Sequence, residues 1–144
     1  MRKFVVTAAM AALGAALIAS PGFGASFDHH FSVIAKTTSQ HRVGERAFAF
    51  KDKLLEPHNR SNRVGRDKGK CRQQTRRSIH CSAVAHLNGE IGGFGDLFVR
   101  GDLGRHDHRL NVVGGTGDFN GVGGKMLFHG RGHRLDKLHF DLVR

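Results

Sequence analysis

The chain has 144 residues, enough for one domain with a substantial core and too few for two. It carries 23 Lys and Arg against 12 Asp and Glu, a net charge of +11 that would attract anionic polymers or lipid headgroups. Because Trp and Tyr are absent, the chain has few stacking groups to offer nucleic acid, and we do not expect it to bind nucleic acid.

Residues 1–25 have the organisation of a secretory signal peptide. Arg2 and Lys3 precede an apolar run, 4–18, that is too short to span a bilayer and ends at small residues and a proline. An anchoring helix is the alternative, which these interruptions disfavour. We therefore expect export of a mature domain, residues 26–144, with a net charge of +9 after loss of the two basic residues.

The mature region alternates apolar and polar residues in short runs and has no sustained helical period. Such runs predict antiparallel strands, here over 31–35, 48–52, 79–87, 94–100, 109–113, 125–129 and 135–142. A further strand should enter at Val64 or Lys68, within or after a charged connection that spans Glu56 to Lys70. The expected fold class is all-β: a closed antiparallel barrel of about eight strands, preferred over a sandwich because closure removes exposed edges.

Asn88-Gly89 is the strongest hairpin signal in the chain, since this pair readily takes the positive φ angles of a tight turn. We expect the strand that ends at Leu87 to fold back onto one that begins near Ile91.

Cys71 and Cys81 are the only cysteines, and they flank a basic turn centred near Arg76. In a hairpin the two would lie opposite one another, within reach of a disulfide, and an even pair in an exported chain favours one. Free thiols, one of them lining a pocket, are the alternative.

The glycine-rich segment 114–124 invites comparison with a phosphate-binding loop. Its spacing is not G-x-G-x-x-G, and a glycine-rich strand follows it instead of a helix. A calcium-binding repeat also fits poorly, because only the segment at 92–96 is similar. The interpretation that remains is structural: a sharp bend and close strand contact at a corner of the barrel.

Two histidine pairs are candidate metal ligands. His106 and His108 flank Asp107, and His29-His30 adds further imidazoles. A third ligand and a supporting shell cannot be identified, so the sequence predicts neither a metal site nor a cofactor.

The same glycine-rich segment carries a family resemblance. Gly114-Gly115-Thr116-Gly117, Phe119, Gly121-Val122 and Gly124 are similar to the G-G-[ST]-G-x-F-x-G-V-x-G stretch of allene oxide cyclases. With Val112 and Val113 the segment also resembles, more loosely, the V-V-G-G-T-G-x-F of plant dirigent proteins. Upstream, Phe50 to Leu54 resembles the cyclases' F-x-N-K-L, and Val64-Gly65, Gly69 and Cys71 their I-G-x-x-x-G-x-C.

This resemblance, which runs from about Val43 to Leu142, implies an eight-stranded barrel with an apolar cavity, often assembled as a trimer. In the cyclases the Asn of the first motif and the Cys of the second lie in the cavity, so Asp52 and Cys71 stand at those positions. In dirigent proteins an acidic residue near the Asp52 position helps to handle a quinone methide. The implied mechanism holds an apolar intermediate in one conformation while polar groups steer ring closure or coupling.

The chain departs from both families. It has no tyrosine, where the cyclases use one in the cavity, and it lacks the arginines of the dirigent motif. These departures argue against allene oxide cyclisation itself.

Asp52 shares a strand face with Phe48 and Phe50. It is either a cavity carboxylate with a raised pKa, able to act as general acid or base, or the solvated last residue of its strand. Asp96 and Arg100 share the face of Phe94 and Phe98. Facing inward they would orient a ligand, and facing outward, the favoured orientation, they would form a weak surface ion pair.

Two hypotheses follow. The first is an exported barrel that binds a small hydrophobic compound and can cyclise or isomerise it, with Asp52 and, if its thiol is free, Cys71 as catalytic residues. Its expected ligand contacts are Phe48, Phe50, Asp96, Phe98 and Arg100. The second is a non-enzymatic exported module whose basic surface binds the cell envelope or another anionic partner.

Overall fold

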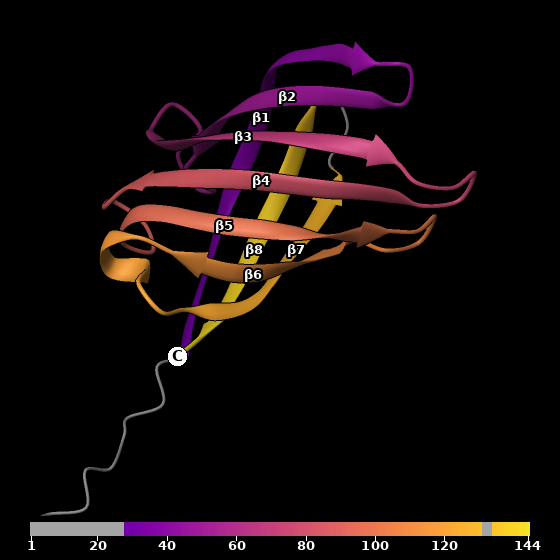
Figure 1. The fold of residues 1–144 in the computed structure, drawn as a ribbon. Coiled ribbons are helices and arrows are strands. Elements are labelled where there is room, and N and C mark those ends of the chain that lie inside the picture. The colour runs from indigo at the N-terminus through magenta and orange to yellow at the C-terminus, as the bar shows by residue number, and fades with distance from the viewer. Residues whose placement is uncertain (1–27, 131–133) are drawn as a thin grey trace, which may run out of the picture.

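Eight strands follow one another around a closed antiparallel barrel in the computed structural model, which describes residues 28–130 and 134–144 (Figure 1). The barrel closes where the first strand pairs with the last, with Phe31 opposite Phe140. The predicted all-β closed barrel is confirmed. The predicted leader, 1–25, lies outside the described residues. In chain order the elements are β1 (Asp28–Gly44), β2 (Ala47–Leu55), β3 (Arg63–Gln73), β4 (Ile79–Asn88), β5 (Phe94–Leu103), β6 (Arg109–Gly115), the short 3-10 helix η1 (Gly117–Phe119), β7 (Gly123–Gly130) and β8 (Leu135–Val143).

Side-chain alternation along each strand builds the core. On β4, Cys81, Ala83, Ala85 and Leu87 are buried inside the barrel, whereas Ser82 between them is exposed. Residues from all eight strands meet in one interior cluster, and each large apolar side chain buried there contributes about 1.5–3 kcal/mol. The fully enclosed members include Val33, Leu54, Val64, Leu87, Leu97, Phe140 and Leu142.

One end of the barrel is closed by aromatic side chains. The Phe31 ring stacks on Phe140 and Phe119, with ring centroids 4.9 and 6.3 Å away. Phe119 comes from η1, which lies in the glycine-rich segment, and Gly117 beside it has a φ of 61°. A side chain at Gly117 would also collide with the Phe94 carbonyl group. The segment is therefore a structural bend, as predicted, that places Phe119 across the barrel end.

Two predicted boundaries can now be compared with the structure. β3 begins at Arg63, which agrees with the earlier of the two expected starts. The Asn88-Gly89 hairpin forms, but β5 begins at Phe94 instead of Ile91, and Asn88 pairs with Phe94 across a longer loop. Gly92 explains the extension, because it takes a φ of 77° and lies against the Phe31 ring.

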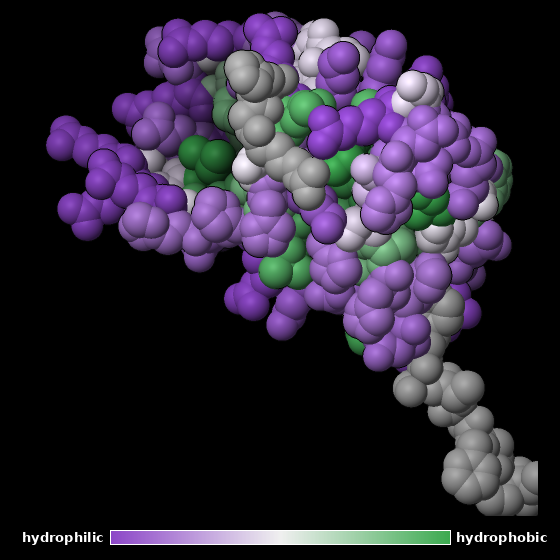
Figure 2. All heavy atoms as spheres, turned by 180° about the vertical axis from the view of Figure 1, so that it is seen from behind, coloured by the Kyte–Doolittle hydropathy of each residue, from purple (hydrophilic) through white to green (hydrophobic). Residues whose placement is uncertain are grey.

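The face of the molecule seen from behind is mainly hydrophilic (Figure 2). Figure 2 shows the side opposite to that of Figure 1, where hydrophobic residues appear only in small separate areas. Within the described ranges, the structure contains no helix of the length and apolarity that a membrane crossing requires.

Candidate active site

A cavity of about 250 Å³ lies inside the barrel, at the end opposite Phe119. Its walls are mostly apolar, and carboxylate groups project into it from three strands, β2, β3 and β8. The apolar lining residues are Ala35, Phe48, Phe50, Ile79, Ala83, Leu103, Leu110, Met126, Phe128 and Leu138, together with the two cysteines. The polar lining residues are Thr37, Gln40, Asp52, Asp67 and Asp136.

Asp52 and Asp67 face one another across neighbouring strands. Asp52 on β2 is the register partner of Asp67 on β3, and both point inward because they share faces with Phe50 and Cys71 respectively. Such partners have Cβ atoms about 4.5–5.5 Å apart. Asp67 is buried, with 7% of its surface exposed, and Asp52 is half-buried. One oxygen of each carboxyl group is buried without a hydrogen-bond partner among the described residues.

This environment raises the pKa of both carboxyl groups. Burial, and then the nearby charge of Asp52, raise the pKa of Asp67 to about 8. Burial also raises the pKa of Asp52 to about 6, although hydrogen bonding with Thr37 opposes the shift and the charge of Asp136 adds to it. Because burial opposes ionisation of both groups and the charge of one opposes that of the other, the pair favours a singly protonated state near pH 7, and the deeper burial of Asp67 favours the proton there.

The structure places Asp52 in the cavity, one of the two positions that the sequence left open. Neither Asp67 nor Asp136 is among the site residues that the sequence predicts. A signal existed for Asp67, because it lies between Gly65 and Cys71 on the same face of an alternating strand. Charged residues hide this face, because the composition of Glu56 to Lys70 predicts a polar connection.

Phe48 and Phe50 line the cavity beside the carboxyl groups, as their shared face with Asp52 predicted. Phe50 pairs in register with Gly69, and the ring occupies the space that a side chain at Gly69 would need. A Cβ there would lie 2.7 Å from Cε1 of Phe50 and 2.7 Å from the Ser82 carbonyl oxygen. Gly69 thus gives the Phe50 ring its place in the wall.

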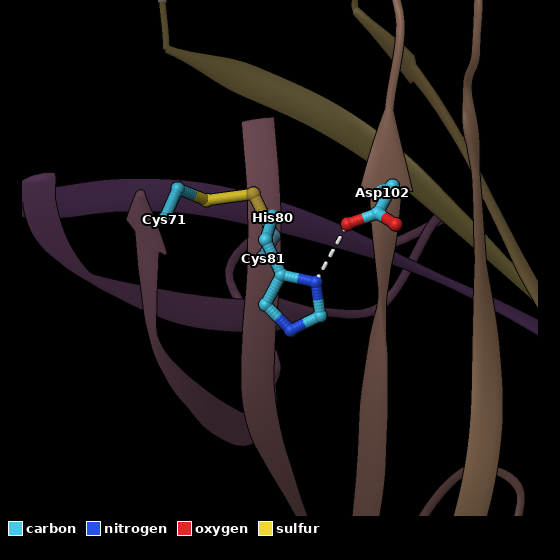
Figure 3. The surroundings of a disulfide bond; sticks show 4 residues. All are labelled: Cys71, His80, Cys81 and Asp102. Atoms are coloured by element: carbon cyan, nitrogen blue, oxygen red, sulfur yellow. Dashed lines mark hydrogen bonds and ion pairs between the residues drawn. A yellow bond between two sulfur atoms is a disulfide. The ribbon is translucent and has the colours of Figure 1, made fainter. Parts of the chain in front are cut away.

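Cys71 and Cys81 form a disulfide with a Cα–Cα distance of 4.1 Å, as their expected placement across a hairpin predicted. Figure 3 shows the bond joining β3 and β4, while His80, next to Cys81, lies close to Asp102 on β5. The suggested catalytic role of Cys71 depended on a free thiol. It is excluded in this structure, and the disulfide instead forms part of the cavity wall.

Asp96, Phe98 and Arg100 do not line the cavity. They lie on the outer face of β5, because the buried residues Leu97 and Val99 occupy the inner face. The prediction that these three residues contact a ligand in the cavity is therefore wrong. Asp96 forms its ion pair with His86, with 2.7 Å between Oδ1 and Nδ1, and not with Arg100.

Comparisons with known proteins show the fold. No family model matches the chain, and no curated protein matches it. Among solved structures, a pyocyanin demethylase superposes with a TM-score of 0.61 at 20% identity, covering 78% of this chain and 98% of that one. The pterocarpan synthase dirigent protein PsPTS1 gives 0.59 at 17% identity, covering 82% and 93%. A second such dirigent protein, GePTS1, gives 0.62 at 15%, covering 82% and 89%.

The chain has a dirigent-like barrel fold. The expected relationship to dirigent and allene oxide cyclase-like barrels is thereby confirmed at the level of architecture. This dirigent-like barrel covers nearly the whole of each neighbour, so the likeness extends around the barrel instead of resting on a few strands.

Proposed function

We propose that this barrel binds a small, largely apolar compound in its cavity and isomerises or cyclises it by proton transfer through Asp52 and Asp67. The observation that carries the proposal is the facing carboxyl pair, with one unpartnered buried oxygen on each group. Buried polar atoms are normally hydrogen-bonded, and exceptions call for a ligand or a reactive role.

The chemistry follows from the two protonation states. Ionised Asp52 accepts a proton from a C–H or O–H group of the substrate, and protonated Asp67 donates its proton to an oxygen or carbon at the other end of the rearranging bonds. The substrate gains and loses one proton, as an isomerisation requires. The pair then returns to its starting state when the proton passes back from Asp52 to Asp67, directly or through water.

Cavity size and lining restrict the substrate. A volume of about 250 Å³ lies just below the roughly 300–1,000 Å³ usual for drug-sized ligands. The walls favour an aromatic or aliphatic skeleton, and the acid pair favours a carbonyl or hydroxyl group. The neighbouring structures are named as a demethylase and two pterocarpan synthases, which supports a catalytic use of this architecture.

Native mass spectrometry of the protein from its producing culture, followed by organic extraction, tests the binding. We expect a stoichiometric apolar compound. Protein that is bare, whatever the culture conditions, would count against the cavity as a ligand site.

Deuterium uptake tests the proton transfer. The extracted compound is returned to the protein in D₂O, and its gain in mass is followed over time. Removing an acid or base typically slows such a step by about 10²–10⁴-fold, so Asp52→Asn and Asp67→Asn should slow uptake by that amount. Asp102→Asn, on the outer face, is the matched control and should exchange at the normal rate. Equal uptake by all variants would refute the role of the pair.

A second candidate function rests on the outer face of β2 and β3. Lys51 faces Lys68 and Lys53 faces Arg66 in register, and all four side chains are exposed. Like charges directly opposite one another are destabilising, so a face built from them favours an anionic partner. We propose that this cationic face (Lys51, Lys53, Arg66 and Lys68) binds an anionic polymer of the cell envelope.

Heparin–agarose chromatography serves as the assay for the cationic face. Lys51→Gln/Lys68→Gln should elute at clearly lower salt than Arg109→Gln/Lys125→Gln, a control of equal charge on β6 and β7. Elution of both at the same salt would show that only net charge matters.

Export and assembly are proposals as well. The disulfide supports an oxidising compartment. N-terminal sequencing of protein from the culture medium should begin near Ser26, and native mass spectrometry should give the mass of a trimer if assembly follows that of the related families.

A further inference from the structure

Three metal-ligating side chains meet on the outer face of the seam where β1 and β8 close the barrel. His30 on β1 is the register partner of Asp141 on β8, and His139 precedes Asp141 by two residues on the same face. We propose that His30, His139 and Asp141 form a binding site for a divalent transition-metal ion such as Zn²⁺. In the described part of the chain, they are the single group of three such residues whose ligand atoms converge.

The ligand atoms already point to one place. His30 Nδ1 lies 2.8 Å from Oδ1 of Asp141, and His139 Nε2 lies 2.9 Å from the same oxygen. All three candidate ligand atoms lie within 4.8 Å of one another. Zinc–nitrogen bonds of about 2.0–2.1 Å place tetrahedral ligand atoms roughly 3.3 Å apart, so small side-chain rotations suffice. A fourth position would be open to solvent, because the side chains are between about one third and one half exposed.

Each imidazole also has a partner on its other nitrogen. His30 Nε2 lies 2.8 Å from Oδ1 of Asp28, and His139 Nδ1 lies 2.8 Å from Oγ of Ser32. A metal-bound histidine almost always donates its other ring N–H to a carboxylate, a carbonyl group or water, and this hydrogen bond fixes the orientation and tautomer of the ring. The two rings lie nearly parallel, with 4° between their planes. The ligand atoms and the groups that orient the two imidazoles are thus both in place before any ion binds.

Two other histidines on the outer surface each pair with a single aspartate, and among the described residues no second imidazole joins either pair. His80 with Asp102 and His86 with Asp96 are also cross-strand pairs on the barrel exterior, each with 2.7 Å between nitrogen and oxygen. Each pair has one imidazole where the β1–β8 site has two. These pairs supply matched controls for adventitious binding to a histidine-rich chain.

The sequence predicts no metal site, because a third ligand cannot be identified beside its histidine pairs. His30 belongs to one of those pairs, whereas His139 and Asp141 lie at the other end of the chain. Closure of the barrel supplies them. An ion at this position would link the first strand to the last, and it would stabilise the folded state because the unfolded chain does not hold the three ligands together.

Isothermal titration of metal-free mature protein with ZnCl₂, together with thermal unfolding, tests the site. We expect one Zn²⁺ per chain and a rise in Tm for the wild type and for His86→Gln. His139→Gln and Asp141→Asn should bind at least about 10-fold more weakly and lose the rise in Tm. Ser32→Ala removes only the support of His139 and should weaken binding by about 10–100-fold.

The controls keep these outcomes separate. The Tm measured in the absence of metal establishes whether each variant is folded. If His139→Gln does not fold, Ser32→Ala and Asp141→Asn still test the site. Binding that is equal in His139→Gln and His86→Gln, or no saturable binding by the wild type, would overturn the proposal. Neither outcome bears on the cavity, because Ser32, His139 and Asp141 do not line it.

Discussion

The substitution Asp67→Asn tests most directly whether Asp67 is protonated in the folded protein. The folded protein raises the pKa of Asp67 from 3.8 to about 8, so folding favours the protonated form. Above pH 3.8 the unfolded chain is ionised while the folded chain keeps its proton. The contribution of Asp67 to stability is therefore greatest below pH 3.8, and it is lost as the pH rises towards 8.

The magnitude follows from proton linkage. Between the unfolded pKa of 3.8 and the folded pKa of about 8, each pH unit lowers the free energy of unfolding by about 1.36 kcal/mol. Asp67 alone should therefore lower the free energy of unfolding by about 4 kcal/mol between pH 5 and pH 8. Asparagine has a similar shape and cannot ionise. Asp67→Asn should therefore lack this loss and should be more stable than the wild type at pH 8.

Urea unfolding at pH 5, 6.5 and 8, with the disulfide intact, measures the effect. The comparison is between the pH dependence of the wild type and that of Asp67→Asn, and Asp102→Asn serves as an exposed control that should follow the wild type. If the wild type loses no more stability than Asp67→Asn between pH 5 and pH 8, Asp67 is not held protonated and the acid role proposed for it fails.

Three further predictions concern the barrel itself. Gly69→Ala should destabilise the fold by about 1–3 kcal/mol in urea unfolding, since its Cβ meets Phe50 and a backbone carbonyl group. Gly123→Ala, with only one contact at 3.8 Å, is its neutral control, and equal effects would contradict the packing argument. Phe119→Ala should cost about 3–5 kcal/mol by opening the closed end, and an effect below about 1 kcal/mol would show that the end is not sealed by this ring. Replacing both cysteines by Ser should lower stability by about 2–4 kcal/mol, and an unchanged denaturation midpoint would show that the bond does not constrain the chain.

Much of the architecture follows from local pattern. Alternation over 79–87 indicated a strand with Cys81, Ala83 and Leu87 on one face, and that face is buried. Glycines in the segment 114–124 indicated a bend, because positive φ angles and close backbone contact need residues without a Cβ. Short-range features of this kind depend on neighbouring residues alone, which explains why they were predictable.

The placement of Asp52 beside Phe48 and Phe50 also follows from alternation, but its depth in the barrel does not. Whether a strand residue ends in solvent or in a cavity depends on the strands around it. Asp67 and Asp136 reach the same cavity from β3 and β8, and no sequence pattern relates them to Asp52.

Local sequence is enough to predict the strands, the bend and the placement of the two cysteines across a hairpin, because period-two alternation and turn chemistry act over a few residues. Tertiary structure decided which face of β5 points inward, since both faces carry apolar residues and only the surrounding core distinguishes Leu97 from Phe98. It also decided which distant polar groups meet. Barrel closure pairs β1 with β8, so His30 and Asp141 become neighbours although 111 residues separate them in the chain.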